Sequence, residues 1–541
     1  MDRRNWLARF GGILAAGGAI GSSSCGEQEK RRQGPSSGAG EGLPEGLNHY
    51  FGDLHNHCEV GYAQGSLARA YEIAEGHLDF FSCTPHSWWH DVPKMVGGKE
   101  SKWLEGFEMT RRRWPEIQQM TRDYHRPGEF VTFPGYEWHS SHFGDFCIVF
   151  PDDDSPLTHY DELAGLQRFA LEKNALLIPH HPAYLQGHRG ANPEHWDPRV
   201  NKLLEIYSEH GNAESDEGQW DYIRHSMGGR WTPNTLQSVL KDGHRMGVLA
   251  SSDDHLGHPG AYGEGLAAVL APELTRKSLF GSLNNRLCYG VTGDRIRINF
   301  AVNGRAMGGE LPFTTERRIA VAVEGWDTIE RVEVLKNNRV VHREHPVDNA
   351  AGADPFRRPV LVRLEYGWGP WASLGIPRIC DWKIKVGVQG GKITELMPGF
   401  QSGPLTEDHR NRIANRSAEG FVLSSYTSRL QAFNERPTNL VVMRIQGGPE
   451  TRITLNLDQP TGMQLTRTLA ELLEDNAVAF TGPFPDESLI LHRAVAETNS
   501  NCSFSFTDSG DGAEDDWYYV RVMQRNNQLA WSSPVWVDRK A

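Results

Sequence analysis

Apolar and polar positions follow one repeating order between residues 50 and 300. A stretch with helical periodicity is followed by a turn and then by a short apolar run that ends in His, Glu or Asp. Helices are predicted over 66–77, 160–174 and 232–245, and strands over 78–87, 129–150 (two strands around Glu137), 175–182, 200–214 and 246–260. Alternating strands and helices of this length favour a parallel sheet, most simply a barrel, and we predict an α/β barrel over residues 48–297.

The pattern changes after residue 297. Residues 317–342 alternate apolar and polar positions on both sides of Asn337-Asn338, which is typical of a β-hairpin, and residues 438–458 and 517–537 follow the same rule. We therefore predict a β-rich region over residues 298–541, built from one or two sandwich-like units. Structural support of the barrel is the expected role, with carbohydrate binding as an alternative.

The first residues resemble a targeting segment rather than part of a fold. Residues 1–27 combine a basic start, a short apolar middle and small residues before Cys25, which is the layout of an export signal. The Arg3-Arg4 pair resembles a twin-arginine signal. Cys25 lies in a weak lipobox, so both a lipid anchor and plain cleavage remain open, and a disordered cytoplasmic tail is the alternative. Residues 28–47 read as a flexible linker, and we expect a periplasmic or envelope location.

Composition narrows the classes of partner. The 541 residues carry a net charge of -13, which disfavours a nucleic-acid backbone or an anionic membrane as the main partner. Of 23 histidines, 19 precede residue 260. The six cysteines other than Cys25 are widely spaced without a CxxC pair, which excludes zinc-finger spacing and a dense disulfide framework.

Residues that bind metals end successive predicted strands. His55 and His57 lie two positions apart, on one face of an extended chain. Other strand ends carry His86, Glu137, His180-His181 and Asp253-Asp254-His255. Because the carboxyl ends of barrel strands meet at one mouth, these side chains are expected to converge there. Imidazole and carboxylate ligands suit Zn²⁺, Mn²⁺ or Fe²⁺.

Such a site supports hydrolysis without a protein nucleophile. Two cations roughly 3.5–4 Å apart can hold both the attacking and the leaving oxygen, and they lower the pKa of a bound water toward about 7, which supplies hydroxide. The sequence has no GxSxG elbow and no P-loop. Acyl-serine and nucleoside-triphosphate chemistry are therefore disfavoured.

Five motifs in this order resemble the PHP (polymerase and histidinol phosphatase) superfamily. They are HxH at 55–57, TPHS at 84–87, GYEW at 135–138, PHHP at 179–182 and SDDH at 252–255. The segments EIYSEHGNAE and RLCYGVTGDRIRI are more similar to the carbaryl-hydrolase-like (CehA/McbA) metallohydrolases and their exported relatives. The resemblance covers nearly all of residues 48–541. It implies a distorted (β/α)7 barrel that binds two or three metal ions.

The resemblance also assigns ligands. His55, His57 and Asp253 match the ligands of the first metal, Glu137 the bridging carboxylate and His181 a ligand of the second metal, while His86 and His255 resemble ligands of a third. For the ligand that follows Glu137, residues 139–145 offer His139, His142 and Asp145; Asp145 fits best and His142 is its rival.

Two departures favour two metals over three. Pro85 stands where the superfamily usually has Asp, and residues 58–66 lack the additional His that members with three metals commonly have. Outside the ligand set, His180 and Asp254 are expected to support it. Glu205, His210 and Glu214 are expected either to fix the barrel mouth by hydrogen bonds or to contact substrate, with His210 as a candidate acid for the leaving group.

The sequence thus predicts an exported metal-dependent hydrolase of a small ester-bearing substrate. The superfamily at large favours a phosphoester, and the nearest branch favours a carboxyl ester or carbamate. A metal-binding or structural protein without catalysis is one alternative. A polysaccharide-processing enzyme is another, although no pair of carboxylates can be placed at the separations that glycosidases need.

Overall fold

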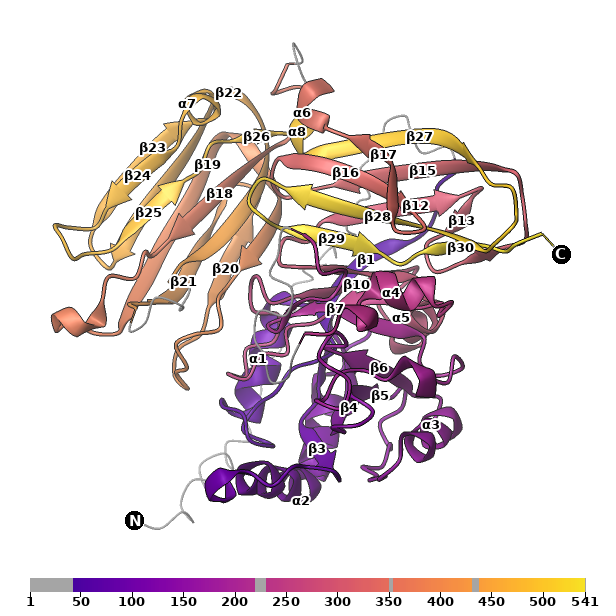
Figure 1. Cartoon of the computed structure of the whole chain (residues 1–541). Coiled ribbons are helices and arrows are strands. Elements are labelled where there is room, and N and C mark those ends of the chain that lie inside the picture. The colour runs from indigo at the N-terminus through magenta and orange to yellow at the C-terminus, as the bar shows by residue number, and fades with distance from the viewer. Residues whose placement is uncertain (1–41, 219–229, 350–353, 431–436, 541) are drawn as a thin grey trace, which may run out of the picture. The chain divides into compact units, whose positions relative to one another are not determined.

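The computed structural model describes residues 42–218, 230–349, 354–430 and 437–540, all within one structural unit (Figure 1). The predicted export signal, residues 1–27, and the linker up to residue 41 lie outside the described residues. In the ranges that are described, no helix is both long and apolar enough to span a membrane.

The N-terminal half alternates strands with helices. Its elements are β1 (Asn48–Asp53), α1 (Leu67–His77), β2 (Phe80–Cys83), β3 (His86–Trp89), the 3-10 helix η1 (Val96–Gly98), α2 (Ser101–Tyr124), β4 (Val131–His139), β5 (Asp145–Val149), α3 (Leu163–Glu172), β6 (Leu176–His180), η2 (Pro193–His195), β7 (Leu203–Ser208), β8 (Gly211–Asn212), η3 (Thr232–Asn234), α4 (Leu236–Lys241), β9 (Gly247–Ala250), β10 (Leu266–Ala271), α5 (Arg276–Asn284) and β11 (Cys288–Val291). The helices predicted over 66–77 and 160–174 are confirmed as α1 and α3. The strand predicted over 78–87 is two strands, because Pro85 lies between β2 and β3 and offers no N–H to a ladder.

Strand pairing confirms a mixed α/β fold but does not give one continuous parallel barrel. β1, β2 and β4 pair in parallel, and β3 is parallel to β4. β5, however, is antiparallel to both β4 and β6, because the short segment 140–144 that joins β4 to β5 allows only a hairpin. β7 pairs in parallel with β9 in a separate three-stranded sheet. The strands that the structure describes therefore do not close a single hydrogen-bonded barrel.

From residue 297 onward the chain is dominated by strands. The first group comprises β12 (Arg297–Val302), β13 (Arg305–Ala306), β14 (Glu310–Leu311), β15 (Glu316–Glu324), β16 (Ile329–Lys336), β17 (Arg339–Glu344), α6 (Pro346–Asn349), β27 (Asn501–Ser509), β28 (Asp516–Gln524), β29 (Leu529–Ser532) and β30 (Val535–Val537). The predicted hairpin is confirmed: β16 and β17 pair antiparallel around Asn337 and Asn338, which take the positive φ angles of 49° and 66° that such a turn requires.

A second group of strands forms its own sheet and core. It contains β18 (Val360–Tyr366), η4 (Ala372–Leu374), β19 (Ile379–Gly399), β20 (Arg412–Ser417), β21 (Gly420–Ser428), β22 (Asn439–Gln459), β23 (Met463–Thr468), α7 (Leu469–Glu474), β24 (Ala477–Phe480), β25 (Ser488–Leu491), β26 (Val495–Ala496) and α8 (Glu497–Ser500). Val362, Trp382 and Val441 belong to the apolar cluster inside this sheet, separate from the cluster that β4 and β7 share with β28.

One sheet runs from the N-terminal half into the C-terminal strands. β29 pairs with β11, which pairs with β10, and β10 pairs with β1. Figure 1 shows β28 and β29 in yellow, the colour of the C-terminal end of the chain. The histidine-bearing strand ends and the last strands of the chain are therefore parts of one continuous framework.

Candidate metal centre

Ten His, Asp and Glu side chains come together at the ends of β1, β3, β4, β5, β6 and β9. They are His55, His57, His86, Glu137, His139, Asp145, His180, His181, Asp253 and His255, and all except His255 are buried. Glu137 and His139 lie two positions apart in β4 and so share one face of that strand. Asp253 has φ 56°, a left-handed backbone conformation directly after β9.

Asp253 and Glu137 lie at the centre of this group. Asp253 Oδ1 lies 2.8 Å from His57 Nε2 and 3.1 Å from His55 Nε2. Glu137 Oε2 lies 3.3 Å from His86 Nε2 and 3.5 Å from His57 Nε2. On its other side, Glu137 Oε1 contacts His180 Nε2. A carboxylate with imidazoles on both oxygens can bridge two cations.

A third carboxylate extends the group away from Asp253. Asp145 Oδ2 lies 3.0 Å from His139 Nδ1 and 3.3 Å from His181 Nε2. Arg189 donates to the same oxygen from Nε at 2.7 Å, with a further contact from Nη2. The guanidinium and the two imidazoles therefore surround the same oxygen of Asp145.

The donor set fits divalent cations. Glu137 Oε2 is buried and accepts no hydrogen bond within the described residues, and His181 Nδ1 is likewise buried without a partner there. Several groups of three ligand atoms lie within 4.8 Å of one another, including His55–His57–Glu137, His55–His180–Asp253 and Asp145–His180–His181. Buried acceptors without donors cost free energy unless a cation satisfies them. Mixed imidazole and carboxylate ligands suit first-row divalent metals.

Burial and neighbouring charges set the protonation states of these ligands. Burial holds the pKa of His57, His86 and His180 well below the usual range and lowers the pKa of His181 to about 3, so these rings are neutral. Burial opposes ionisation of Asp253, but His55 and His210 outweigh it and hold the pKa of Asp253 well below its usual range.

The other two carboxyl groups differ in their surroundings. Burial disfavours the charged form of Asp145, yet Arg189 and His139 reverse this effect and hold the pKa of Asp145 well below its usual range. For Glu137 burial dominates and raises the pKa well above its usual range, since Asp145 and Asp253 add to the negative charge nearby. A cation beside Glu137 supplies the positive charge that the protein alone does not.

Two neighbours orient these ligands. Glu205 Oε2 lies 3.0 Å from His55 Nδ1, which holds a ring proton at that nitrogen and turns His55 Nε2 toward Asp253. His210 is held at both nitrogens, with Nδ1 2.6 Å from Tyr184 Oη and Nε2 2.7 Å from Asp253 Oδ2.

A pocket of about 270 Å³ opens onto the cluster. Besides ligand-type residues it is lined by Tyr62, Trp103, Arg189, Glu209 and His210. Tyr62 stacks on His86 with ring centroids 3.9 Å apart, so an aromatic wall adjoins the candidate ligands. The pocket is large enough for a small substrate group.

Most of the site residues predicted from the sequence lie within this group of ten. Three predicted residues lie at its rim or outside it: His255, His142 and Asp254. His255 lies at the rim, where its side chain is 32% exposed and Nδ1 is 3.0 Å from Glu209. His142 is exposed and joins no cluster, so Asp145 and not His142 lies in the group. The Asp254 carboxylate accepts the backbone N–H groups of Leu256 and His258 and so shapes the turn after β9.

The sequence predicted His181 as a metal ligand and His180 only as support for the ligands. In the structure both rings face the carboxylates, so the geometry does not separate the two residues. His180 contacts Glu137 and His181 approaches Asp145. Glu214, for which the sequence left open a hydrogen-bonding role at the barrel mouth or substrate contact, accepts hydrogen bonds from Tyr519, Arg521 and Trp531 of the C-terminal strands.

Sequence reasoning missed several residues of the centre. His139 was only an option for the position of Asp145, although its spacing from Glu137 equals that of His57 from His55, and the same alternation rule identifies both pairs. Arg189, Tyr62 and Tyr184 lie in irregular segments, where no periodicity signals that they face the site.

Comparisons with known proteins give relatives without an assigned activity. No family model matches the sequence. An uncharacterised protein of Chlamydia trachomatis serovar D is 26% identical over 256 residues, which are 43% of this chain and 41% of the relative. A second, from Chlamydia pneumoniae, is 26% identical over 258 residues, or 44% of this chain and 41% of the relative. The chain thus spans about two fifths of the length of these curated relatives.

One solved structure is also similar. It is a two-domain protein containing a predicted PHP-like metal-dependent phosphoesterase, from Bacteroides vulgatus. The match has 12% sequence identity and a TM-score of 0.31, and it covers 79% of this chain and 97% of that one. The functional argument therefore rests on the residues of the site itself.

Proposed function

We propose that this chain is a metal-dependent hydrolase of the PHP superfamily that cleaves phosphoesters. The observation that carries the proposal is the convergence of buried carboxylate oxygens and imidazole nitrogens around Asp253 and Glu137, in groups whose ligand atoms lie within 4.8 Å of one another. The order of the five sequence motifs supports the family.

The ligand groups divide among at least two cations. His55, His57 and Asp253 would hold one, and His180, His181 and Asp145 another, with Glu137 between them. His86 and His255 adjoin the first group and are the residues available to a third cation. Divalent cations bound here supply Lewis-acid chemistry, because they polarise the substrate and acidify water.

The chain's own residues favour an anionic substrate. Arg189 lines the pocket and keeps its positive charge beside Asp145, and a guanidinium recognises phosphate oxygens through charge-assisted hydrogen bonds. Tyr62 and Trp103 cover the other side and restrict water. His210 lines the same pocket, and we assign it the proton that the leaving oxygen takes up.

Carboxyl ester or carbamate cleavage is the second candidate, suggested by the motifs shared with the carbaryl-hydrolase-like branch. The apolar rings of Tyr62 and Trp103 in the pocket are compatible with it. Export to the periplasm or envelope, with or without a lipid at Cys25, is part of the same proposal and rests on the pattern of residues 1–27.

The test is hydrolysis of four probes by the purified full chain: p-nitrophenyl phosphate, bis(p-nitrophenyl) phosphate, p-nitrophenyl acetate and 1-naphthyl N-methylcarbamate. We expect turnover of a phosphoester that a chelator abolishes and Mn²⁺ or Zn²⁺ restores. Arg189→Met should raise KM for the phosphoester more than for the neutral esters. Faster turnover of the acetate or carbamate would favour the second candidate. Activity unaffected by chelation, or no turnover of any probe, would contradict the proposal.

A further inference from the structure

Glu214 links the metal centre to the last strands of the chain. Its side chain is buried, and its carboxylate accepts hydrogen bonds from Tyr519 Oη at 2.8 Å, Trp531 Nε1 at 2.8 Å and Arg521 Nη1 at 3.0 Å. Tyr519 and Arg521 lie two positions apart on one face of β28, and Trp531 of β29 is the cross-strand partner of Arg521. Two neighbouring strands thus present three donors to one carboxylate.

The segment from His210 to Glu214 connects the anchored Glu214 carboxylate to the metal centre. β8 pairs with β7 directly after His210, and Ala213 N donates to Ile206 O at 2.8 Å. Glu214 N donates to Asn212 Oδ1 at 2.9 Å, which fixes the residues between the anchor and the site. At the other end of the segment, His210 Nε2 lies 2.7 Å from Asp253.

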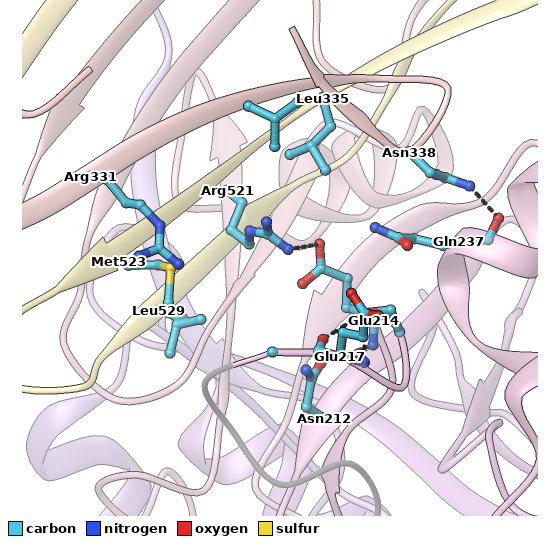
Figure 2. Close-up of a pocket in the computed structure, with 13 residues that line it drawn as sticks. Asn212, Glu214, Glu217, Gln237, Arg331, Leu335, Asn338, Arg521, Met523 and Leu529 are labelled. Carbon is cyan, nitrogen blue, oxygen red and sulfur yellow. Dashed lines mark hydrogen bonds and ion pairs between the residues drawn. The ribbon is translucent and has the colours of Figure 1, made fainter. Parts of the chain in front are cut away.

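A cavity adjoins this anchor. A cavity of about 610 Å³ is lined by Glu214 and Arg521 together with residues of β8, α4, β16 and β17. Figure 2 shows the Arg521–Glu214 ion pair within it, below the hairpin that carries Leu335 and Asn338. Among the described residues, hydrogen bonds from β28 and β29 hold the Glu214 carboxylate at the edge of this cavity.

We propose that β28 and β29 complete the metal centre by fixing the His210 segment through Glu214, which is a positioning residue. This proposal rests on the proposed metal site and deepens it. The C-terminal strands then contribute to metal binding, because without them His210 no longer keeps the Asp253 carboxylate in place for the cation.

Glu333 provides a matched control. It is as buried as Glu214 and receives Arg521 Nη2 at 2.7 Å from the same strand, but its other partners are Arg331 and Arg343, which lie outside the His210 segment. Removal of either carboxylate costs a buried ion pair on Arg521, and only Glu214 connects that pair to the site.

The experiment measures metal retained by the full chain after a fixed chelator challenge, together with Tm. Glu214→Ala should lose apparent metal affinity by about 10- to 100-fold, the range seen when residues that orient ligands are removed. Glu333→Ala should lower Tm to a similar degree and retain metal like the parent. Glu214→Gln, which keeps one of the two acceptor oxygens, should retain more metal than Glu214→Ala. Trp531→Phe is the milder variant if Glu214→Ala does not fold.

The outcomes separate this proposal from the proposed function. Suppose that the parent binds metal, and that Glu214→Ala or Trp531→Phe retains it as well as the parent and Glu333→Ala do. This result would overturn the positioning role alone. A parent that holds no metal would overturn the proposed function, and the positioning role with it.

Discussion

The Nε2 atoms of His55 and His57 lie 3.1 Å apart, and both face Asp253 Oδ1. His57 is neutral because of burial. In contrast, burial lowers the pKa of His55, but Asp253, Cys147 and Glu205 together outweigh it and raise this pKa well above its usual range. A proton on His55 Nε2 occupies the place that a cation takes between the two rings and the carboxylate. This arrangement is the basis of the predictions that follow.

Glu205 should control metal affinity without contacting the metal. Glu205→Gln weakens the hydrogen bond that fixes the His55 ring, so metal affinity should fall by about 10- to 100-fold. Isothermal titration with Zn²⁺ measures the change. The control is Glu365→Gln, which removes a similar carboxylate–imidazole contact, 2.7 Å from His492, in the second sheet. Equal affinity in the two variants would refute the role of Glu205.

Arg189 should set the acid limit of metal binding. The guanidinium holds the pKa of Asp145 well below its usual range, against the effect of burial, so the carboxylate stays charged as the pH falls. In Arg189→Gln burial is no longer opposed by that charge, the pKa of Asp145 rises, and metal should be released at a higher pH than in the parent. Metal content after dialysis across a pH series measures this shift.

Arg199→Gln is the matched control for that experiment. Arg199 pairs with Asp197 at 2.6 Å on the surface, away from the site. The pH profile of metal release from Arg199→Gln should coincide with that of the parent. A profile of Arg189→Gln that also coincides would mean that Asp145 does not depend on the guanidinium.

His258 should make the fold less stable in acid. Burial, with His77 and Arg69 nearby, holds the pKa of His258 well below its usual range, so the unfolded chain takes up a proton that the folded chain refuses. This contribution to stability is present above the unfolded pKa of about 6.5 and is lost as the pH falls below it, by about 2 kcal/mol at pH 5. His258→Asn removes the titration.

Urea unfolding at pH 7.5 and pH 5 measures this effect. The loss of unfolding free energy between the two values should be smaller in His258→Asn than in the parent. His142→Asn, at an exposed histidine, should behave as the parent. The same pH dependence in all three proteins would exclude His258 as a source of acid sensitivity.

Much of the candidate site could be predicted because alternation along a strand is a local signal. Residues two positions apart in a strand lie on one face. This rule predicted the pairing of His55 with His57 and applies equally to Glu137 and His139. Strand ends carrying His86 and Asp253 indicated where the side chains would meet. The prediction needed only the order of strands and the rule that parallel strands end at one edge.

Other features depend on contacts that no local pattern encodes. Helix α2 was not predicted; its mean hydropathy is low and Pro115 lies inside it. The antiparallel pairing of β5 depends on the length of the connection after β4 rather than on the apolar pattern. For Glu214 a structural hydrogen-bonding role was one of two expectations, but its partners Tyr519 and Trp531, which follow 305 and 317 residues later in the chain, could not be predicted. Such partners are set by the tertiary fold.

The most direct test of the account is the metal content of the purified full chain, measured by elemental analysis beside the double variant His57→Ala/Asp253→Ala. The account predicts two or more equivalents of a divalent transition metal in the parent and a sharp fall in the variant, with both proteins folded by circular dichroism. Less than half an equivalent in the parent, unchanged in the variant, would contradict it.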